Sequence, residues 1–371
     1  MRVAVLWTLE TDYFWSTVRA LVRNGHQAFV GTCGRDEDSP HAMNDGGGEV
    51  EYARNLAAAE LTARLDSFRP DILVVAGWHI PEFVTASRHF RGRACRVLVL
   101  DNQWRATLKQ RVGQIAFRTT LRDVYDCALV PGPRQVAFAE HMGLDRMKIA
   151  LGGIPCNYED FDAPADSYGR YFLTAGRLAP EKGVDVLLDA YRRYRSRVTD
   201  PWELVICGTG PLPQQRLDGV EWAGFAAPKE LAERMANAGA FVLASVFEPW
   251  AVVLHEAAAS GRPIIASSEC GAVGTFVLDG INGHVARTGD PDHLADCLEL
   301  VSRMPTGRLE EWGRRSKHLA ARSTPDTWVD SVVNLHRRWQ KGAAAPTGGL
   351  RRGWSARRRS GEFAPGAASR P

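Results

Sequence analysis

Short apolar runs alternate with longer amphipathic stretches in the first half of the chain. The apolar runs predict strands at residues 3–6, 28–31, 72–76, 97–100 and 128–130. Helical patterns lie between them, for example over residues 15–24 and 56–67. The Gly- and Asp-rich stretch 32–50 predicts a surface loop. Strands that alternate with helices are typical of α/β proteins with parallel sheets.

A second alternating series follows residues 157–168, whose Glu, Asp, Pro and Ala content predicts a linker. Its strands are expected at residues 171–175, 204–207, 222–225, 241–244 and 263–266. Its helices are expected at residues 184–197, 229–238 and 252–260. Asp290 and Pro291 open one more helix, since Asp caps helices well and Pro suits the first helical position. Two open parallel sheets joined by a linker leave a cleft, and ligands bind such sheets at the carboxyl ends of the strands.

Composition excludes several classes of protein. Hydrophobic residues make up 45% and charged residues 24% of the 371 residues, which excludes a wholly disordered chain, collagen and a coiled coil. No apolar run is long enough to span a membrane, and the first residues read as a buried strand rather than a signal peptide. Seven scattered cysteines without a Cys-x-x-Cys pair argue against a disulfide framework or a zinc site and favour a reducing cytoplasm.

The net charge of +3 is unevenly distributed. Residues 341–371 carry seven Lys and Arg against the single Glu362, so the rest of the chain has no basic excess. This argues against a nucleic-acid partner. Within the first half, however, the run from Arg88 to Arg122 holds nine basic residues against Asp101 alone. Such a run suits an anionic membrane or an anionic substrate, and equally a solvated helix face.

The densest chemical signal is Gly176-Arg177-Leu178-Ala179-Pro180-Glu181-Lys182-Gly183, between a predicted strand and a predicted helix. Glycine lets a backbone approach a ligand closely, and Arg177 and Lys182 bring two positive charges to a helix N-terminus, where anions are favoured. A diphosphate fits this loop. A surface loop in which a cation pairs with Glu181 fits it equally, and the sequence lacks a Walker loop.

Two further segments lie at predicted strand ends. The first, Cys207-Gly208-Thr209-Gly210-Pro211, begins like the glycine motif of dinucleotide-binding proteins, but Pro213 stands where the third glycine is required. This disfavours a nicotinamide cofactor. The loop can still line a nucleotide pocket. In the segment from Phe247 to Ala257, Glu248 precedes a helix and Glu256 lies within it. Carboxylates accept hydrogen bonds from sugar hydroxyls, and free N–H groups at the helix start can bind phosphate. A helix-start charge plus an interior ion pair is the alternative.

Taken together in this order and spacing, the three segments resemble the donor-binding half of family 4 retaining glycosyltransferases, which have the GT-B fold. Gly261-Arg262-Pro263 and Asp279-Gly280-Ile281-Asn282-Gly283 follow in the expected order. The resemblance is strong over about residues 171–301, a third of the chain, and weak over residues 126–157.

The resemblance implies a role for each matching residue. Arg177 and Lys182 would hold the diphosphate of a UDP- or GDP-sugar, Glu256 would accept the ribose hydroxyls, and Glu248 would face the donor sugar. Backbone N–H groups near Trp250 and Ala251 would bind the distal phosphate. The remaining donor-binding residues are Gly176 in the first loop, and Gly208, Gly210 and Phe225 beside the nucleoside. It also implies that no metal and no other cofactor is needed, because Arg, Lys and helix dipoles neutralise the leaving group.

Two departures from the family pattern concern the same cleft. Trp250-Ala251 stands where the family has Phe-Gly, and a close backbone approach at Ala251 requires a negative φ there. Many members carry a catalytic His after a later strand of the first domain, where this chain has Asp101-Asn102. Asp101 and His79 are the candidates for that position. Asp101 as a helix cap and His79 as a structural residue are the alternatives.

The resemblance implies a GT-B architecture of two Rossmann-like domains. The acceptor-binding domain is expected at residues 1–156, the linker at 157–168 and the donor-binding domain at 169–324. A helix at 325–340 would return to the first domain, and residues 341–371 would form a disordered basic tail.

The implied activity is retaining transfer of a hexosyl group from a nucleotide-diphosphate sugar to a hydroxyl of a glycan or lipid-linked acceptor. Surface polysaccharide or glycolipid biosynthesis, in the cytoplasm or peripherally at the inner face of the plasma membrane, is the expected setting. The alternatives are a catalytically inactive nucleotide-sugar-binding subunit and a GT-B nucleotide-sugar epimerase or hydrolase.

Overall fold

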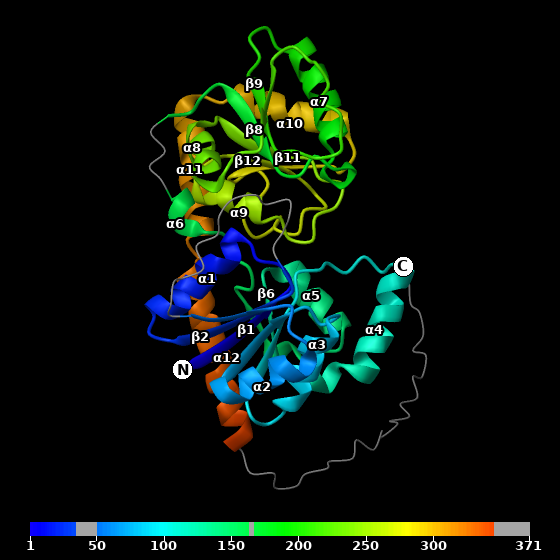
Figure 1. The fold of residues 1–371 in the computed structure, drawn as a ribbon. Coiled ribbons are helices and arrows are strands. Elements are labelled where there is room, and N and C mark those ends of the chain that lie inside the picture. The colour runs from blue at the N-terminus through cyan, green and yellow to red at the C-terminus, as the bar shows by residue number, and fades with distance from the viewer. Residues whose placement is uncertain (35–49, 163–166, 345–371) are drawn as a thin grey trace, which may run out of the picture.

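The computed structural model describes residues 1–34, 50–162 and 167–344, which form two α/β domains. Figure 1 shows the domain of the first half of the chain below and that of the second half above. The sequence prediction of two Rossmann-like domains with parallel sheets is confirmed by the topology of both sheets. Most of the predicted loop at residues 32–50 and of the predicted tail lies outside the described residues.

The first sheet has seven parallel strands in the order β3-β2-β1-β4-β5-β6-β7. They are β1 (Arg2–Trp7), β2 (Gln27–Thr32), β3 (Val50–Arg54), β4 (Ile72–Ala76), β5 (Cys95–Val99), β6 (Cys127–Val130) and β7 (Ile149–Leu151). Val3 and Val5 join one apolar cluster, while Ala4 and Leu6 join the other. Because alternate residues of β1 are buried on opposite faces, the strand is a continuous apolar run.

Helices cover both faces of this sheet. They are α1 (Asp12–Arg23), α2 (Ala58–Phe68), α3 (Pro81–His89), α4 (Leu108–Thr120) and α5 (Pro133–His141). The last helix of the described chain, α12 (Pro325–Ala344), also packs on this domain, against α1 and the sheet. Figure 1 shows α12 running down the lower domain although it follows the upper domain in sequence. It continues past residue 340, so the first residues of the predicted tail are helical.

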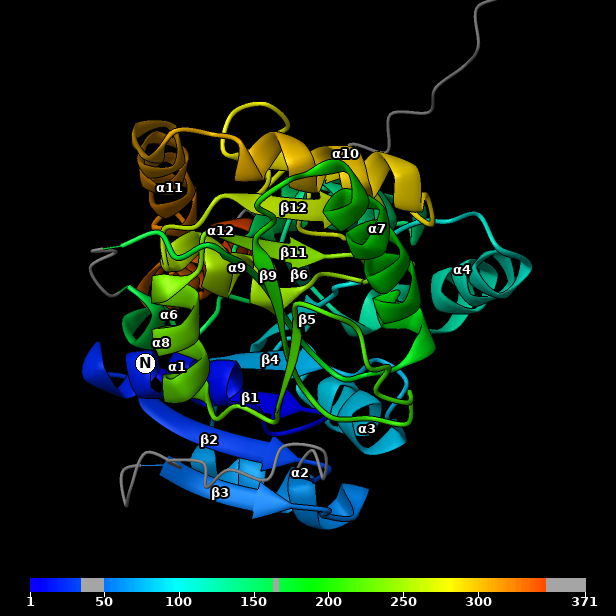
Figure 2. The ribbon, with the colours of Figure 1, turned by 90° about the horizontal axis from the view of Figure 1, so that it is seen from above.

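The second sheet has six parallel strands in the order β10-β9-β8-β11-β12-β13. They are β8 (Tyr171–Ala175), β9 (Glu203–Cys207), β10 (Val220–Gly224), β11 (Ala240–Leu243), β12 (Ile264–Ser267) and β13 (Gly283–Ala286). Its helices are α7 (Val184–Arg197), α8 (Pro228–Asn237), α9 (Val252–Ala259), α10 (Pro291–Ser302) and α11 (Thr306–Ala320). The pair α7 and α10 packs together on one face, and α9 packs with α11 on the other (Figure 2). Asp290 caps α10 as predicted, accepting a hydrogen bond from the His293 N–H at 3.0 Å.

Elements with a weak apolar pattern were not predicted. The edge strand β3 reads Val-Glu-Tyr-Ala-Arg and lies at the end of the stretch that was interpreted as a loop. Strands β7 and β13 are only three and four residues long. The short helix α6 (Tyr158–Phe161) lies in the predicted linker, where Phe161 is buried and joins an apolar cluster that includes residues of both domains. Within the predicted linker, Phe161 therefore takes part in the core.

Candidate active site

A cavity of about 960 Å³ lies at the carboxyl ends of β8 and β9, beside the loop that follows β11. Seven of the predicted site residues line it: Gly176, Arg177, Lys182, Gly208, Gly210, Phe225 and Glu248. Leu9 reaches it from the first domain. The other three predicted second-domain residues, Trp250, Ala251 and Glu256, are not among the described residues that form its wall. One cavity thus unites three segments that are distant in sequence.

The two glycine loops pack on each other through their backbones. The Leu178 N–H donates to the Thr209 carbonyl at 2.8 Å, and the Gly176 N–H donates to the Cys207 carbonyl at 3.0 Å. A Cβ at Gly208 would lie 1.9 Å from the Gly176 carbonyl oxygen, and one at Gly210 would lie 2.4 Å from that of Leu178. Glycine is therefore required at 208 and 210 by contact between the loops. A Cβ at Gly176 would meet nothing within 4 Å, although its φ of 149° also favours glycine.

The charged residues of the cavity form two ion pairs. The Lys182 Nζ lies 2.5 Å from Glu248 Oε2, and these side chains are only 23% and 16% exposed. The Ser245 hydroxyl is 3.5 Å from the same carboxylate oxygen. Arg177 instead pairs with Glu181 at 2.6 Å on the exposed surface of the loop. Lys182–Glu248 is the less exposed of the two pairs. An anion bound beside it would therefore interact with its charges more strongly than an anion bound beside Arg177–Glu181.

The first domain contributes a second hollow, of about 250 Å³, at the carboxyl ends of β1, β4 and β5. Asp101 and His79, the two candidates for the catalytic position, both line it. Burial raises the pKa of the Asp101 carboxyl, and the negative charge of Glu248 raises it further. Asp101 therefore lies within electrostatic reach of the Lys182–Glu248 pair. It does not cap α4, because Thr107 is the N-cap residue and accepts from the Gln110 N–H.

Side chains of the first domain hold the loop that carries Glu248. The Gln103 amide donates to the carbonyls of Glu248 at 2.8 Å and Glu269 at 3.1 Å. The Arg134 guanidinium donates to the Gln103 amide oxygen at 3.2 Å and to the Ser268 carbonyl at 2.7 Å. Neither Gln103 nor Arg134 belongs to a sequence motif, so this contact between the domains could not be predicted. Gln103 follows Asp101 by two positions, so one loop carries both a candidate catalytic residue and this contact.

Trp250 and Ala251 lie at the contact between the domains. The Trp250 indole N–H donates to the Ile154 carbonyl at 3.1 Å, and the Gln135 amide donates to the Pro249 carbonyl at 2.7 Å. Both Trp250 and Ala251 are buried. Ala251 has a φ of 75°, so the negative φ that the sequence analysis required is not present. Ala251 is the residue immediately before α9, and its left-handed backbone conformation is strained for alanine.

Replacing Ala251 by glycine should therefore stabilise the protein. Relief of the left-handed strain outweighs the added flexibility of the unfolded chain, and we expect a gain of about 0.5–1 kcal/mol in the free energy of unfolding. Urea denaturation measures it. The matched control is Ala258→Gly inside α9, where φ is helical and the loss should be about 1 kcal/mol or more. Equal destabilisation by the two substitutions would contradict the strain at Ala251.

Glu256 faces the first domain. Burial raises the pKa of its carboxyl to about 8, and the negative charge of Asp12, at the start of α1, contributes. The folded protein therefore retains this proton up to about pH 8, whereas an unfolded glutamate releases it near its ordinary value of 4.5. Because the folded state binds more protons over this interval, this group makes the free energy of unfolding fall as the pH rises from about 4.5 to about 8.

Glu256→Gln should remove that dependence. Relative to the wild type, the variant should gain a few kcal/mol of stability near pH 8 and little or nothing near pH 4.5. Chemical denaturation at both pH values measures the difference. Glu233→Gln on the exposed face of α8 is the matched control and should change neither value. A gain of the same size at both pH values would mean that the Glu256 carboxyl is not protonated in the folded state.

The basic run from Arg88 to Arg122 is not one surface. Arg96 is 3% exposed and its guanidinium bonds the Asp126 carboxylate at 2.8 Å, while Arg93 pairs with Asp66 at 2.7 Å. The exposed basic side chains of its second part are Arg105, Lys109, Arg111, Arg118 and Arg122, on α4 and the segments beside it. The exposed positive charge that would suit an anionic membrane or substrate is thus concentrated around α4.

The described residues contain neither a candidate metal site nor a candidate membrane-spanning helix. No group of three or more His, Cys, Asp or Glu side chains in this part of the chain is placed to hold a metal ion. Likewise, none of the helices that the structure describes combines the length and the apolar character that a membrane crossing needs.

The second domain is similar to known glycosyltransferases. Residues 169–303 match the family model described as glycosyl transferases group 1. The chain is 30% identical over 139 residues to an uncharacterised glycosyltransferase of Methanocaldococcus jannaschii, and 31% identical over 186 residues to the D-inositol 3-phosphate glycosyltransferase of a Nocardioides species. These alignments cover 35% and 42% of the chain, and 38% and 40% of the relatives, so the chain spans less than half of their length.

Solved structures resemble both domains together. Anabaena HepE in complex with UDP and glucose matches with a TM-score of 0.67 at 14% identity, over 92% of this chain and 99% of that one. The protein therefore has the GT-B architecture predicted from the sequence. Its second domain, over residues 169–303, is similar to the group 1 glycosyltransferases.

Proposed function

We propose that the protein is a retaining glycosyltransferase that transfers a hexosyl group from a nucleotide-diphosphate sugar to a hydroxyl of a glycan or lipid-linked acceptor. The observation that carries the proposal is the cavity at the ends of β8 and β9, which holds the shielded Lys182–Glu248 pair. Asp101 of the other domain lies within electrostatic reach of this pair. Support for donor chemistry comes from HepE, whose structure contains UDP and glucose. We place the enzyme in surface polysaccharide or glycolipid biosynthesis.

The donor would lie along the cavity with its base at one end and its sugar at the other. Phe225, Ala226 and Leu231 form an apolar part of the wall that suits a nucleobase. Arg177 and Lys182, which both line the cavity, would bind the diphosphate. Glu248 would then be freed from Lys182 to accept hydrogen bonds from sugar hydroxyls. We propose that this charge arrangement needs no bound metal.

The reaction breaks the bond between the anomeric carbon and the diphosphate, so negative charge grows on the departing oxygens. Lys182 lies where that charge would develop, and a fixed cation in a shielded site stabilises the transition state more than it would in water. The attacking hydroxyl must lose a proton, for which the departing diphosphate and the Asp101 carboxylate are candidate acceptors. Retention of the anomeric configuration is proposed from the resemblance of residues 176–183 and 248–256 to family 4 enzymes.

The acceptor would enter from the hollow of the first domain. Asp101 and His79 line this hollow, so either can orient an acceptor hydroxyl toward the donor sugar. Contacts such as that of Gln103 with the Glu248 carbonyl join the two domains beside the cleft, where they would help to exclude water. Exclusion of water would favour transfer over hydrolysis.

The test is product analysis with UDP- and GDP-hexoses and a crude lipid acceptor fraction. We expect a new glycosidic bond whose anomeric proton coupling in NMR matches that of the donor. An inverted product would refute the retaining assignment. Free hexose or an epimer formed equally well without acceptor would favour a hydrolase or epimerase. Tight nucleotide binding without any product would favour a binding subunit.

A further inference from the structure

Helix α4 exposes an apolar stripe that no other described element covers. Leu108 is 78% exposed, Val112 is 60% exposed and Ile115 is 64% exposed. Large apolar side chains at such exposure cost free energy in water, and their spacing of four and three residues places them on one face of the helix. The stripe is therefore a candidate contact surface.

The opposite face of α4 anchors it to the domain. Phe117 is the buried residue of this helix, and its ring meets the Trp78 ring edge-on at 5.8 Å between centroids. Phe117 lies nine positions beyond Leu108, which is two and a half helical turns, so it is on the side of α4 opposite the stripe. The stripe cannot turn inward without breaking this anchor, so its exposure is a fixed property of the fold.

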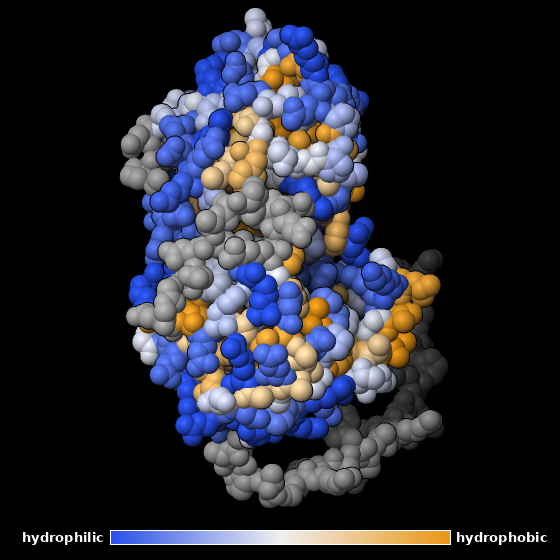
Figure 3. All heavy atoms as spheres, viewed as in Figure 1, coloured by the Kyte–Doolittle hydropathy of each residue, from blue (hydrophilic) through white to orange (hydrophobic). Residues whose placement is uncertain are grey.

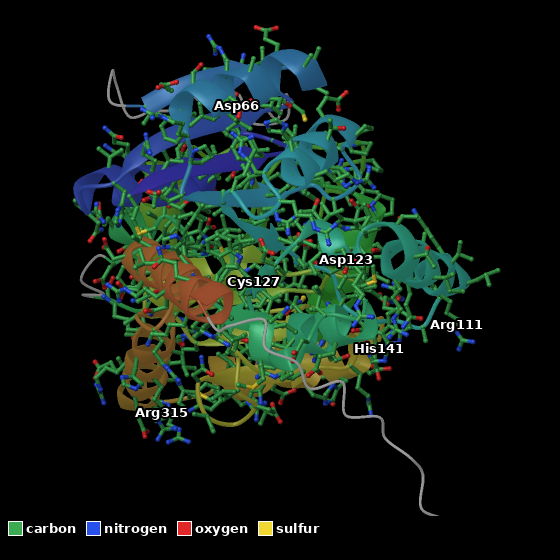
Figure 4. The ribbon with its side chains drawn as sticks, turned by 90° about the horizontal axis from the view of Figure 1, so that it is seen from below. Asp66, Arg111, Asp123, Cys127, His141 and Arg315 are labelled. Atoms are coloured by element: carbon green, nitrogen blue, oxygen red, sulfur yellow. The ribbon has the colours of Figure 1, made fainter. Side chains whose placement is uncertain are left out.

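Basic side chains flank the stripe. Lys109 lies on one side of it around the helix axis, and Arg111 and Arg118 lie on the other. All three are exposed, and residues 102–122 contain no Asp or Glu. Figure 3 shows the apolar patch at the right of the lower domain, over α4, and Figure 4 shows Arg111 projecting from the end of the same helix. An apolar strip bordered by cations matches an anionic lipid surface.

The stripe begins beside the cleft. The segment between Asp101 and α4 carries Gln103, which contacts the second domain, and Arg105, whose guanidinium lies 4.4 Å above the centroid of the Phe247 ring. Phe247 lines the donor cavity. Leu108 therefore lies at the cleft end of α4, and a surface that binds α4 comes close to the opening between the domains.

We propose that α4 binds in the plane of an anionic bilayer, with Leu108, Val112 and Ile115 among the acyl chains and Lys109, Arg111 and Arg118 at the head groups. Bound in this way, the protein presents its cleft to the membrane surface, where a lipid-linked acceptor resides. This last consequence depends on the proposed function, whereas membrane binding itself does not. A symmetric contact of two copies through α4 is disfavoured, because it would bring the basic flanks together without acidic partners.

Vesicle flotation of the full chain tests the proposal. The wild type should float with vesicles of equal parts phosphatidylcholine and phosphatidylglycerol, and much less with phosphatidylcholine alone. The triple variant Leu108→Ser, Val112→Ser, Ile115→Ser should lose at least about 100-fold in partitioning. The double variant Lys109→Gln, Arg111→Gln should lose about fivefold for each charge, and its binding should depend less steeply on added salt than that of the wild type.

The matched control is Leu300→Ser, which removes a 55% exposed apolar side chain from α10 of the other domain and should leave flotation unchanged. Each variant should keep the wild-type thermal shift with nucleotide, which separates loss of membrane binding from failure of the proposed function. Unchanged flotation of the triple variant would overturn the proposal. So would concentration-dependent dimerisation that the triple variant abolishes, since the stripe would then bind a second copy.

Discussion

Lys182→Ala should lower kcat/KM for sugar transfer by at least about 1000-fold. The substitution removes the cation that would neutralise the departing diphosphate, and loss of a single group that stabilises developing charge costs about 100- to 1000-fold. It also leaves Glu248 as an unpaired carboxylate that is only 16% exposed, which repels the phosphates of the donor. A radiolabelled donor and a lipid acceptor measure the rate, and circular dichroism checks the fold.

Glu248→Ala should abolish transfer to a similar extent for a different reason. Lys182 remains, so nucleotide alone should still bind, whereas the donor sugar loses its carboxylate partner. Lys229→Ala is the matched control, because Lys229 is exposed on α8 of the same domain and should leave the rate unchanged. Wild-type rates for either Lys182→Ala or Glu248→Ala would contradict the assigned site.

The second large effect is expected for Gln103→Leu, which should lower kcat by about 100-fold with little change in the donor KM. Its amide bridges the first domain to the carbonyls of Glu248 and Glu269, so the substitution releases the Glu248 loop without touching the donor cavity. A displacement of about 1 Å at a reacting group is enough for an effect of this size. Gln103 is thus a positioning residue.

A matched control distinguishes positioning from a general loss of stability. Gln114→Leu removes an equivalent amide-to-carbonyl bond, to His141, that lies within the first domain. This variant should keep the wild-type kcat with a soluble acceptor. If Gln103→Leu instead raised KM and left kcat intact, the contact would serve donor binding and the positioning role would be wrong.

The sequence predicted the buried parallel strands and the amphipathic helices best. β4 at Ile72–Ala76 and α7 at Val184–Arg197 have the predicted bounds, because a strand buried on both faces is a continuous apolar run and a half-buried helix is periodic. The edge strand β3 was missed because its pattern is weak and its position depends on pairing with β2. Most apolar side chains of helix α4 face solvent and only Phe117 is buried, so its apolar positions do not mark a face that packs on the core.

For the site, strand ends predicted which residues share the cavity but not how they are paired. Gly176, Lys182 and Glu248 lie together because parallel strands end at one edge of a sheet. The partner of Lys182 was not predictable, since Glu181 and Glu248 are both carboxylates within its possible reach. Gln103 contacts a carbonyl 145 residues away, and backbone acceptors leave no trace in a sequence. The positive φ of Ala251 was likewise not predictable, since alanine disfavours the left-handed region.

The most direct test of the central claim, that the cavity at the ends of β8 and β9 binds a nucleotide-diphosphate sugar, is a thermal-shift screen. UDP, GDP, ADP and their common sugar conjugates are compared with and without magnesium, for the wild type and for Lys182→Ala. A ligand that binds only the folded state raises Tm. The account predicts a clear rise with one nucleotide family, independent of magnesium and lost in Lys182→Ala. No rise with any of them would contradict it, since Arg177, Lys182 and Glu248 would then not form a working donor site.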